Sequence, residues 1–183
     1  MKRKTFLQRI AIGSGGIVLI PSVGILTGCE YEPVVRITLA ESDVPFLNEI
    51  AETILPATSD FGGAKAAKVG EYLLTMYRDC MSSEEQQALV NGINELDARS
   101  SEQLQSSFIK ADPSERQLLL EEVQSEAMKN PDNPHYLPLL KSLVIQGYFT
   151  SEIGMTKARN YMFVPGSYEG CIPYQKSDGV WAI

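Results

Sequence analysis

The sequence has few of the residues that build cofactor and metal sites. It contains one histidine and three cysteines among 183 residues. It has no Cys-x-x-Cys-His haem attachment motif and no Gly-x-Gly-x-x-Gly fingerprint, and no Gly-x-Ser-x-Gly nucleophile motif lies near His135. The chain therefore holds little material for a haem, zinc, flavin or hydrolase site of its own, and His135 is expected to begin a helix rather than to catalyse.

Positive charge is scarce after the N-terminus. Lys2, Arg3, Lys4 and Arg9 precede position 29, which leaves 12 basic against 23 acidic side chains for the rest of the chain. An acidic body is repelled by phosphate backbones and by anionic lipid headgroups. Nucleic acid is therefore not an expected partner.

The sequence also lacks a long uninterrupted apolar run. Residues 10–27 carry no charge, but four glycines and Pro21 interrupt them. A stable spanning helix needs about 20 apolar residues, whereas a basic start followed by a short apolar segment is typical of an export signal. We predict a signal peptide over residues 1–28, with an uncleaved N-terminal anchor as the alternative.

The end of this segment, residues 26–29 (LTGC), resembles the lipobox of bacterial lipoproteins. The resemblance implies that Cys29 is lipidated and becomes the first residue of the mature chain. Two or three acyl chains would hold the protein firmly at a membrane. We therefore expect an exported, membrane-anchored lipoprotein on the periplasmic side of the cell envelope, with residues 29–41 as a linker.

The first residues also resemble a twin-arginine signal. Residues 3–8 (RKTFLQ) lie where such signals read Arg-Arg-x-Phe-Leu-Lys, with Lys4 in place of the second arginine. That route exports folded proteins, often with a cofactor-loaded companion. An ordinary Sec signal remains the alternative.

Helical patterns predict a single, mostly α domain of about five helices over residues 42–183, which includes a C-terminal tail. Apolar residues recur at spacings of three and four, and Ser82 with Glu85 and Asp112-Pro113 with Glu115 are helix-start signals. The predicted helices cover about residues 42–55, 64–80, 83–97, 113–128 and 136–148. Phe108 and Ile109 are expected to enter the core from a connection, and only residues 34–39 could form a strand.

The C-terminal residues 161–183 are different, because glycines and prolines interrupt them and no helical period is present. This irregular tail holds five of the 15 aromatic residues, namely Tyr161, Phe163, Tyr168, Tyr174 and Trp181. They either pack back on their own helices or, with Tyr148, form a partner interface, in which Tyr and Trp are enriched.

If Cys29 carries lipid, the remaining cysteines are an even pair, Cys80 and Cys171. Disulfides persist in exported proteins, so a bridge between these two is expected, with two free thiols as the alternative. The bridge would attach the tail to the second helix.

Several segments together resemble one known family, the gluconate 2-dehydrogenase subunit 3 family. They are residues 50–58 (IAETILPAT), 62–70 (GGAKAAKVG), 77–80 (YRDC), 147–157 (GYFTSEIGMTK) and 164–173 (VPGSYEGCIP). Members are small exported helical proteins that accompany a large flavin-dependent oxidoreductase of the glucose-methanol-choline type, often with a cytochrome c subunit. The likeness covers nearly all of the mature chain.

The resemblance implies a non-catalytic accessory subunit that exports, stabilises and anchors a gluconate, sugar or polyol dehydrogenase. FAD would then belong to the large partner and haem c to a further subunit, with no cofactor in this chain. The alternative is a free-standing lipoprotein that binds a small ligand in a helical pocket lined by Tyr148, Tyr161 and Trp181, or another envelope protein. An enzyme in its own right would have to rely on His135 and surface carboxylates.

The lipobox gives a direct prediction for the mass of the mature chain. Protein extracted from membranes with detergent should lack residues 1–28 and carry lipid on Cys29, because cleavage follows acylation. Intact-mass spectrometry checks this, and a Cys29→Ser variant should keep the full-length, lipid-free mass. An unmodified full-length mass for the unaltered chain would contradict the prediction.

Overall fold

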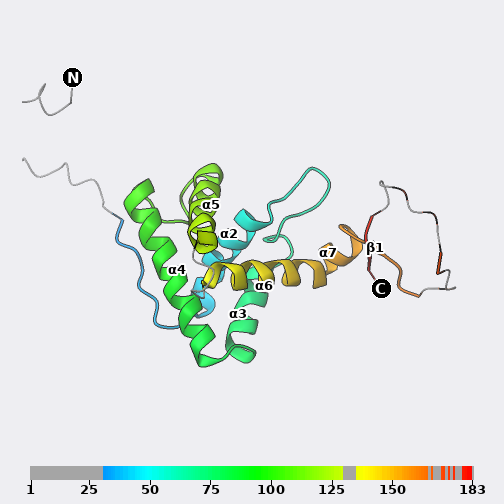
Figure 1. Ribbon diagram of the computed structural model, residues 1–183, viewed down its shortest axis with the longest axis horizontal. Coiled ribbons are helices and arrows are strands. Elements are labelled where there is room, and N and C mark those ends of the chain that lie inside the picture. Colours follow the sequence, from blue (N-terminus) through cyan, green and yellow to red (C-terminus); the bar gives the residue numbers. More distant parts are fainter. Residues whose placement is uncertain are drawn as a thin grey trace, which may run out of the picture. The chain divides into compact units, whose positions relative to one another are not determined.

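A computed structural model describes residues 31–129 and 135–164 and, in the tail, 166, 170, 171, 173, 175 and 179–182. The predicted signal peptide, Cys29, Tyr168 and Tyr174 lie outside the described residues. The elements follow the order η1 (Glu41–Asp43), α2 (Val44–Ile54), α3 (Val69–Asp79), α4 (Ser83–Leu104), α5 (Pro113–Lys129), α6 (Tyr136–Thr150), α7 (Glu152–Thr156), β1 (Asn160–Tyr161) and β2 (Trp181–Ala182). The mostly α class is confirmed (Figure 1).

The two helix-start signals predicted at Ser82 and Asp112 are present and form capping bonds. The Ser82 hydroxyl accepts from the Glu85 amide at 3.3 Å, and the Glu85 carboxylate accepts from the Ser82 amide at 2.9 Å. Asp112 and Glu115 make the equivalent amide-to-carboxylate bond before α5, at 3.1 Å. Each bond satisfies an amide that the first helical turn leaves without a partner.

The second predicted helix starts later than the pattern suggested. Residues 64–68 form turns, and α3 begins only at Val69. The interruption lies at Lys68, whose φ of 56° is in the left-handed region and cannot continue a helix. α4 is longer than expected and ends at Leu104, before Gln105 with a φ of 54°.

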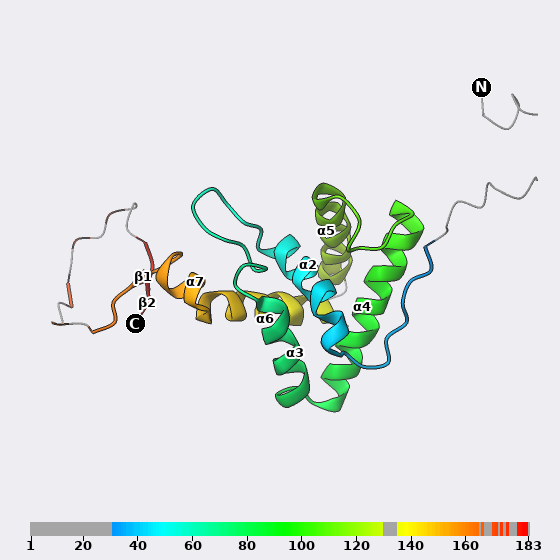
Figure 2. The same ribbon diagram turned by 180° about the vertical axis from the view of Figure 1, so that it is seen from behind.

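Helix α6 lies at the centre of the bundle and contacts α2, α3, α4 and α5 (Figures 1 and 2). Its buried side chains form one face of the helix, and they include Leu137, Leu140, Leu143, Val144 and Tyr148. The opposite face, with Ile145, is exposed. The other helices cover the buried face, and the core is built around this contact.

Two short elements were not predicted. Helix α7 follows α6 directly, and Ser151 caps it by accepting from the Gly154 amide at 3.1 Å. Strands β1 and β2 then pair in parallel, which opposes Asn160 to Trp181. Two residues per strand are too few to show a period in the sequence.

Residues 31–40, which we call the strap, are not a β-strand, although residues 34–39 were a candidate. The strap, which lies within the predicted linker 29–41, is hydrogen-bonded to α4. Leu39 ends it with a buried side chain. The packed part of the chain thus includes the residues before the first helix.

The connection between α4 and α5 places two neighbouring apolar residues very differently. Phe108 is fully buried, and its ring centroid lies 5.7 Å from that of Phe46. Ile109 is 42% exposed, so the prediction that both enter the core is correct only for Phe108.

This difference gives a stability prediction. Phe108→Ala should lower the free energy of unfolding by about 3–5 kcal/mol, because it removes a fully buried ring and leaves a cavity. Ile109→Ala is the matched control, and its cost should be about 1 kcal/mol or less because its side chain keeps its contact with water. Urea unfolding followed by circular dichroism measures both, and equal losses would contradict the assignment of Phe108 to the core.

Candidate docking and anchoring surfaces

The family-like segments around positions 62 and 148 meet in space although 86 residues separate them. The Tyr148 hydroxyl donates to the Gly62 carbonyl at 2.8 Å. The Ser151 hydroxyl donates to the Tyr148 carbonyl at 2.6 Å, and a Cβ at Gly154 would lie 1.9 Å from that same oxygen. These residues therefore fix the sharp passage from α6 into α7, and α7 sets where the tail begins.

The Gly62-Gly63 loop binds a carboxylate of its own chain. Glu52 accepts from the Ala57 amide at 2.9 Å and from the Lys65 amide at 2.7 Å. A Cβ at Gly63 would lie 2.4 Å from this carboxylate, so only glycine allows the close approach. The loop amides already hold an anion, which agrees with the absence of a phosphate-binding motif.

The tail brings two distant apolar segments together. The Asn160 amide donates to the Val180 carbonyl at 2.9 Å, next to the β1–β2 pair. Large apolar side chains on both segments are exposed, and we call this set the tail patch: Tyr161, Met162, Phe163, Val164, Val180 and Trp181. Monomeric proteins rarely leave such clusters in water, so the tail patch is a candidate interaction surface.

The structure separates the residues predicted for the partner interface. Phe163 is 85% exposed and Trp181 49%, and Tyr161 is exposed beside them. Tyr148 instead lies in the core and is 7% exposed, so it is not a surface contact. The aliphatic members of the tail patch were not predicted, because exposure of Val164 and Val180 depends on the tail pairing.

The alternative function, a lipoprotein that binds a small ligand, needed a pocket lined by Tyr148, Tyr161 and Trp181, and the structure does not bring these three side chains together in one. Tyr148 is part of the core, whereas Tyr161 and Trp181 lie on the exposed tail. The Tyr148 hydroxyl donates to the Gly62 carbonyl inside the fold. These three side chains therefore do not line a common pocket.

The expected bridge between Cys80 and Cys171 is not formed, and both thiols are free and exposed. Cys80 is the C-cap residue of α3, beside the start of α4. The tail begins after α7, where β1 contacts α7 and pairs with β2 (Figure 2). The even number of cysteines suggested a pair that the fold does not bring together.

His135 has the structural role that its position suggested. Its Nδ1 accepts from the Leu137 amide at 3.1 Å, and its ring stacks on Tyr136 with 4.7 Å between centroids. A ring nitrogen that caps α6 is not free to act as a general base. Within residues 31–129, 135–164 and the described part of the tail, no group of three or more His, Cys, Asp or Glu side chains could hold a metal ion.

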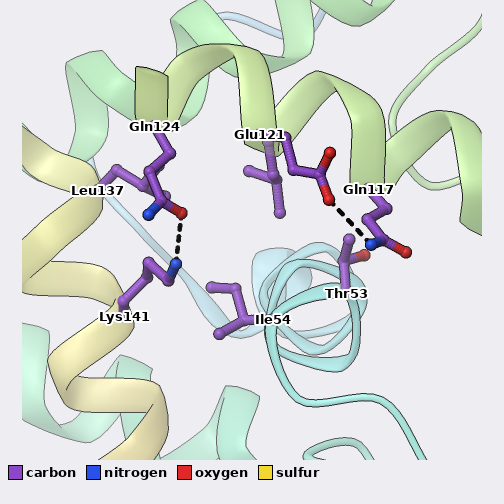
Figure 3. A pocket seen from close by; sticks show the side chains of 8 residues that line it. Thr53, Ile54, Gln117, Glu121, Gln124, Leu137 and Lys141 are labelled. Carbon is purple, nitrogen blue, oxygen red and sulfur yellow. Dashed lines mark hydrogen bonds between the residues drawn. The ribbon is translucent and has the colours of Figure 1, made fainter. Parts of the chain in front are cut away.

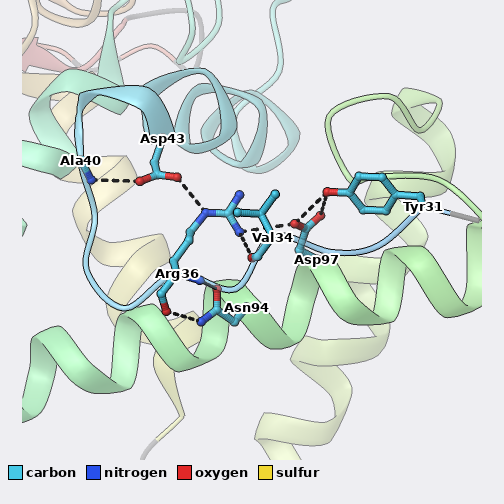
Figure 4. Close-up of polar contacts among 7 residues, drawn as sticks. All are labelled: Tyr31, Val34, Arg36, Ala40, Asp43, Asn94 and Asp97. Carbon is cyan, nitrogen blue, oxygen red and sulfur yellow. Dashed lines mark hydrogen bonds and ion pairs between the residues drawn. The ribbon is translucent and has the colours of Figure 1, made fainter.

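A buried ionic network holds the strap on α4 (Figure 4). The Arg36 guanidinium donates to Asp43 at 2.8 Å and to the fully buried Asp97 at 3.3 Å. The Tyr31 hydroxyl donates to Asp97 at 3.1 Å. Burial and the Asp97 carboxylate raise the pKa of the Tyr31 phenol above its ordinary value.

Backbone contacts add to this network and fix the register of the strap. Asn94 on α4 exchanges two bonds with the backbone of Arg36, at 2.9 and 2.7 Å. The Ser101 hydroxyl donates to the Tyr31 carbonyl at 2.6 Å. Positions 94, 97 and 101 share one face of α4, so the strap runs antiparallel to that helix. Sequence analysis missed these residues, although a charged Arg36 within an apolar run was the available signal.

A surface cavity of about 190 Å³ lies between α2, α5 and α6 (Figure 3). Its lining residues are Thr53, Ile54, Gln117, Leu120, Glu121, Gln124, Leu137 and Lys141. Lys141 donates to Gln124 at 2.6 Å, and Gln117 donates to Glu121 at 2.9 Å. These polar groups satisfy one another, and the cavity holds no nucleophile with a base in reach.

No helix in the described part of the chain has both the length and the apolar character needed to cross a membrane. The residues that the structure does bring together on the surface are the tail patch and the strap. Both offer apolar contacts and neither offers reactive groups.

Comparison with known proteins gives one match. Residues 41–166, more than half of the chain, match the family model described as Gluconate 2-dehydrogenase subunit 3. The matched range begins with η1 and ends inside the tail. No curated protein and no solved structure matches the chain.

Proposed function

Because the chain belongs to the gluconate 2-dehydrogenase subunit 3 family, whose members are accessory subunits of a dehydrogenase complex, we propose a specific role for it within such a complex. It is the non-catalytic small subunit of a flavin-dependent gluconate, sugar or polyol dehydrogenase of the glucose-methanol-choline type. It accompanies the large subunit during export, stabilises it and anchors it to the membrane. FAD belongs to the large subunit, and a cytochrome c subunit with haem c receives the electrons.

The tail patch is the single observation that carries the docking part of this proposal. It gathers exposed aromatic and aliphatic side chains, which include Phe163 and Trp181, on a short paired segment. Aromatic anchors of this kind dominate the binding energy of protein interfaces. The rigid turn from Tyr148 to Gly154 holds this segment away from the core, where a partner can reach it.

The absence of catalytic groups in the described bundle supports a non-catalytic role. His135 caps a helix, and the carboxylates of the described core are paired with arginines or with backbone amides. Burial alone raises the pKa of Glu49, but hydrogen bonds from Lys65 and Arg116 outweigh it, so its pKa lies below the ordinary value. A carboxylate kept ionised by two cations is a structural group rather than a proton donor.

Anchoring is proposed from the lipobox. Cys29 lies only two positions before Tyr31, where the strap becomes bonded to α4. An acyl group on that cysteine would hold the subunit, and the large subunit docked on it, at the membrane surface. Export together with a folded partner would follow from the twin-arginine-like start.

The experiment that tests the proposal is gentle detergent extraction of native membranes and capture on this chain. The captured material should contain a second protein of several hundred residues. Its absorbance spectrum should show a flavin band at about 450 nm, because the flavin resides in the partner. Mock capture from cells without the tagged chain is the control. A colourless chain recovered alone would contradict the accessory role and favour a free-standing lipoprotein.

The tail patch yields a sharper prediction. Trp181→Ala should weaken association with the large subunit by about 1–3 kcal/mol, because truncation of an interface aromatic removes much of its contact energy. Leu118→Ala is the matched control, since Leu118 is an exposed apolar residue on α5, outside the patch. Quantitative recovery of flavoprotein under increasing detergent washes measures both. Equal losses for the two variants, or none for Trp181→Ala, would place the interface elsewhere.

A further inference from the structure

The strap has the reverse of the usual arrangement of polar and apolar side chains. Its charged residue, Arg36, faces inward with only 7% of its side chain exposed. Its aliphatic neighbours face outward: Val35 is 80% exposed, Ile37 88%, and Val34 more than half. Single exposed aliphatic residues are common on protein surfaces, but three within four positions beside a buried arginine are not.

The buried network prevents the strap from turning over. Arg36 bonds to Asp43 and Asp97 and lies 4.3 Å above the Phe46 ring. Arg36 is held inward by these bonds, whereas the residues on either side of it, Val35 and Ile37, are exposed. To bury the aliphatic side chains instead, the fold would have to move the guanidinium into water and leave Asp97 unpaired inside.

We propose that Val34, Val35 and Ile37 insert into the interfacial region of the bilayer that carries the lipidated Cys29. This inference rests on the anchoring role proposed above and adds the surface that the domain turns toward the membrane. The strap is then the face of the domain that contacts the lipid bilayer.

Chain length makes the bilayer the nearest candidate. Val34 is five residues from Cys29 in the sequence. An extended chain covers at most about 3.6 Å per residue, so Val34 lies within about 18 Å of the anchored cysteine. Tyr31, two residues from Cys29, is already fixed to Asp97 and Ser101. An acylated Cys29 would therefore hold the strap close to the lipid.

Charge decides how the strap contacts lipid. The chain from Cys29 onward carries 12 basic against 23 acidic residues, and the positive charge of Arg36 is paired with Asp43 and Asp97. Attraction to anionic headgroups is therefore absent, and exposed Glu32 adds to the repulsion. Uncharged aliphatic side chains enter the boundary between headgroups and acyl chains without that attraction.

Tryptophan fluorescence in the mature lipidated chain, which begins at Cys29, tests the proposal. Trp181 is the single tryptophan, so Val35→Trp in a Trp181→Phe background moves the only fluorophore to the strap, and we call it the strap tryptophan. The unaltered chain, with Trp181 on the tail after α7, is the matched control. Both are reconstituted without the partner in phosphatidylcholine vesicles whose acyl chains are brominated near the headgroup, since bromine quenches tryptophan only on contact.

We expect a blue-shifted emission from the strap tryptophan and a fractional loss of emission severalfold larger than that of Trp181. Equal weak quenching, with both tryptophans quenched by iodide from the aqueous side, overturns the proposal. Shielding of the strap tryptophan only after the large subunit is added also overturns it, because the occupant is then protein.

The mass of the chain separates this proposal from the anchoring role. If the mass shows no acyl group, the anchoring role is contradicted. The strap proposal is then tested by quenching of the strap tryptophan in the full-length unlipidated chain mixed with the same vesicles. Quenching of the strap tryptophan in that mixture supports the strap as a lipid-binding face, and its absence overturns it. If the acyl group is present and the strap tryptophan stays in water, the anchor stands and the strap proposal fails.

Discussion

The burial of α6 is the interaction on which the rest of the structure depends. Lys141 is its one charged residue, and its buried side chains, which include Leu137, Leu140 and Val144, form one face. Such a face is stable in water only when other elements cover it, and α2 to α5 contact this helix. A tyrosine near each end of α6 contacts another element. Tyr136 packs over Gly92 of α4, and Tyr148 donates to the Gly62 carbonyl and begins the turn into α7.

In the described part of the chain, the strap and the tail patch are both exposed apolar surfaces, and they belong to different elements of this bundle. The strap lies on α4, and the tail patch follows α7, beyond the C-terminal end of α6 (Figures 1 and 2). In the proposed accessory role, the strap would face the lipid and the tail patch would face the large subunit. The position of the strap depends on the pairing of Arg36 with Asp97, since a buried carboxylate that loses its cation costs about 3–5 kcal/mol.

Local signals predicted most of the helices but not all of their limits. Ser82 with Glu85 marked the start of α4, and His135 marked the start of α6, because a capping bond joins residues that are close in the sequence. The late start of α3 at Val69 was missed, since the left-handed Lys68 is held by its turn and not by a residue preference. Phe108 and Ile109 look alike in the sequence, and only the packing of Phe108 on Phe46 distinguishes them.

The sequence by itself determined the helical class, the family, the acidic character and the lipobox-like Cys29, because these depend on composition and on short motifs. The tertiary structure decided that Cys80 and Cys171 stay apart, that Tyr148 is a core residue, and that Trp181 lies beside Tyr161. It also decided that Arg36 faces inward and Val35 outward. These features require contacts between residues about 20 to 90 positions apart, and the chain acquires such contacts only when the helices pack around α6.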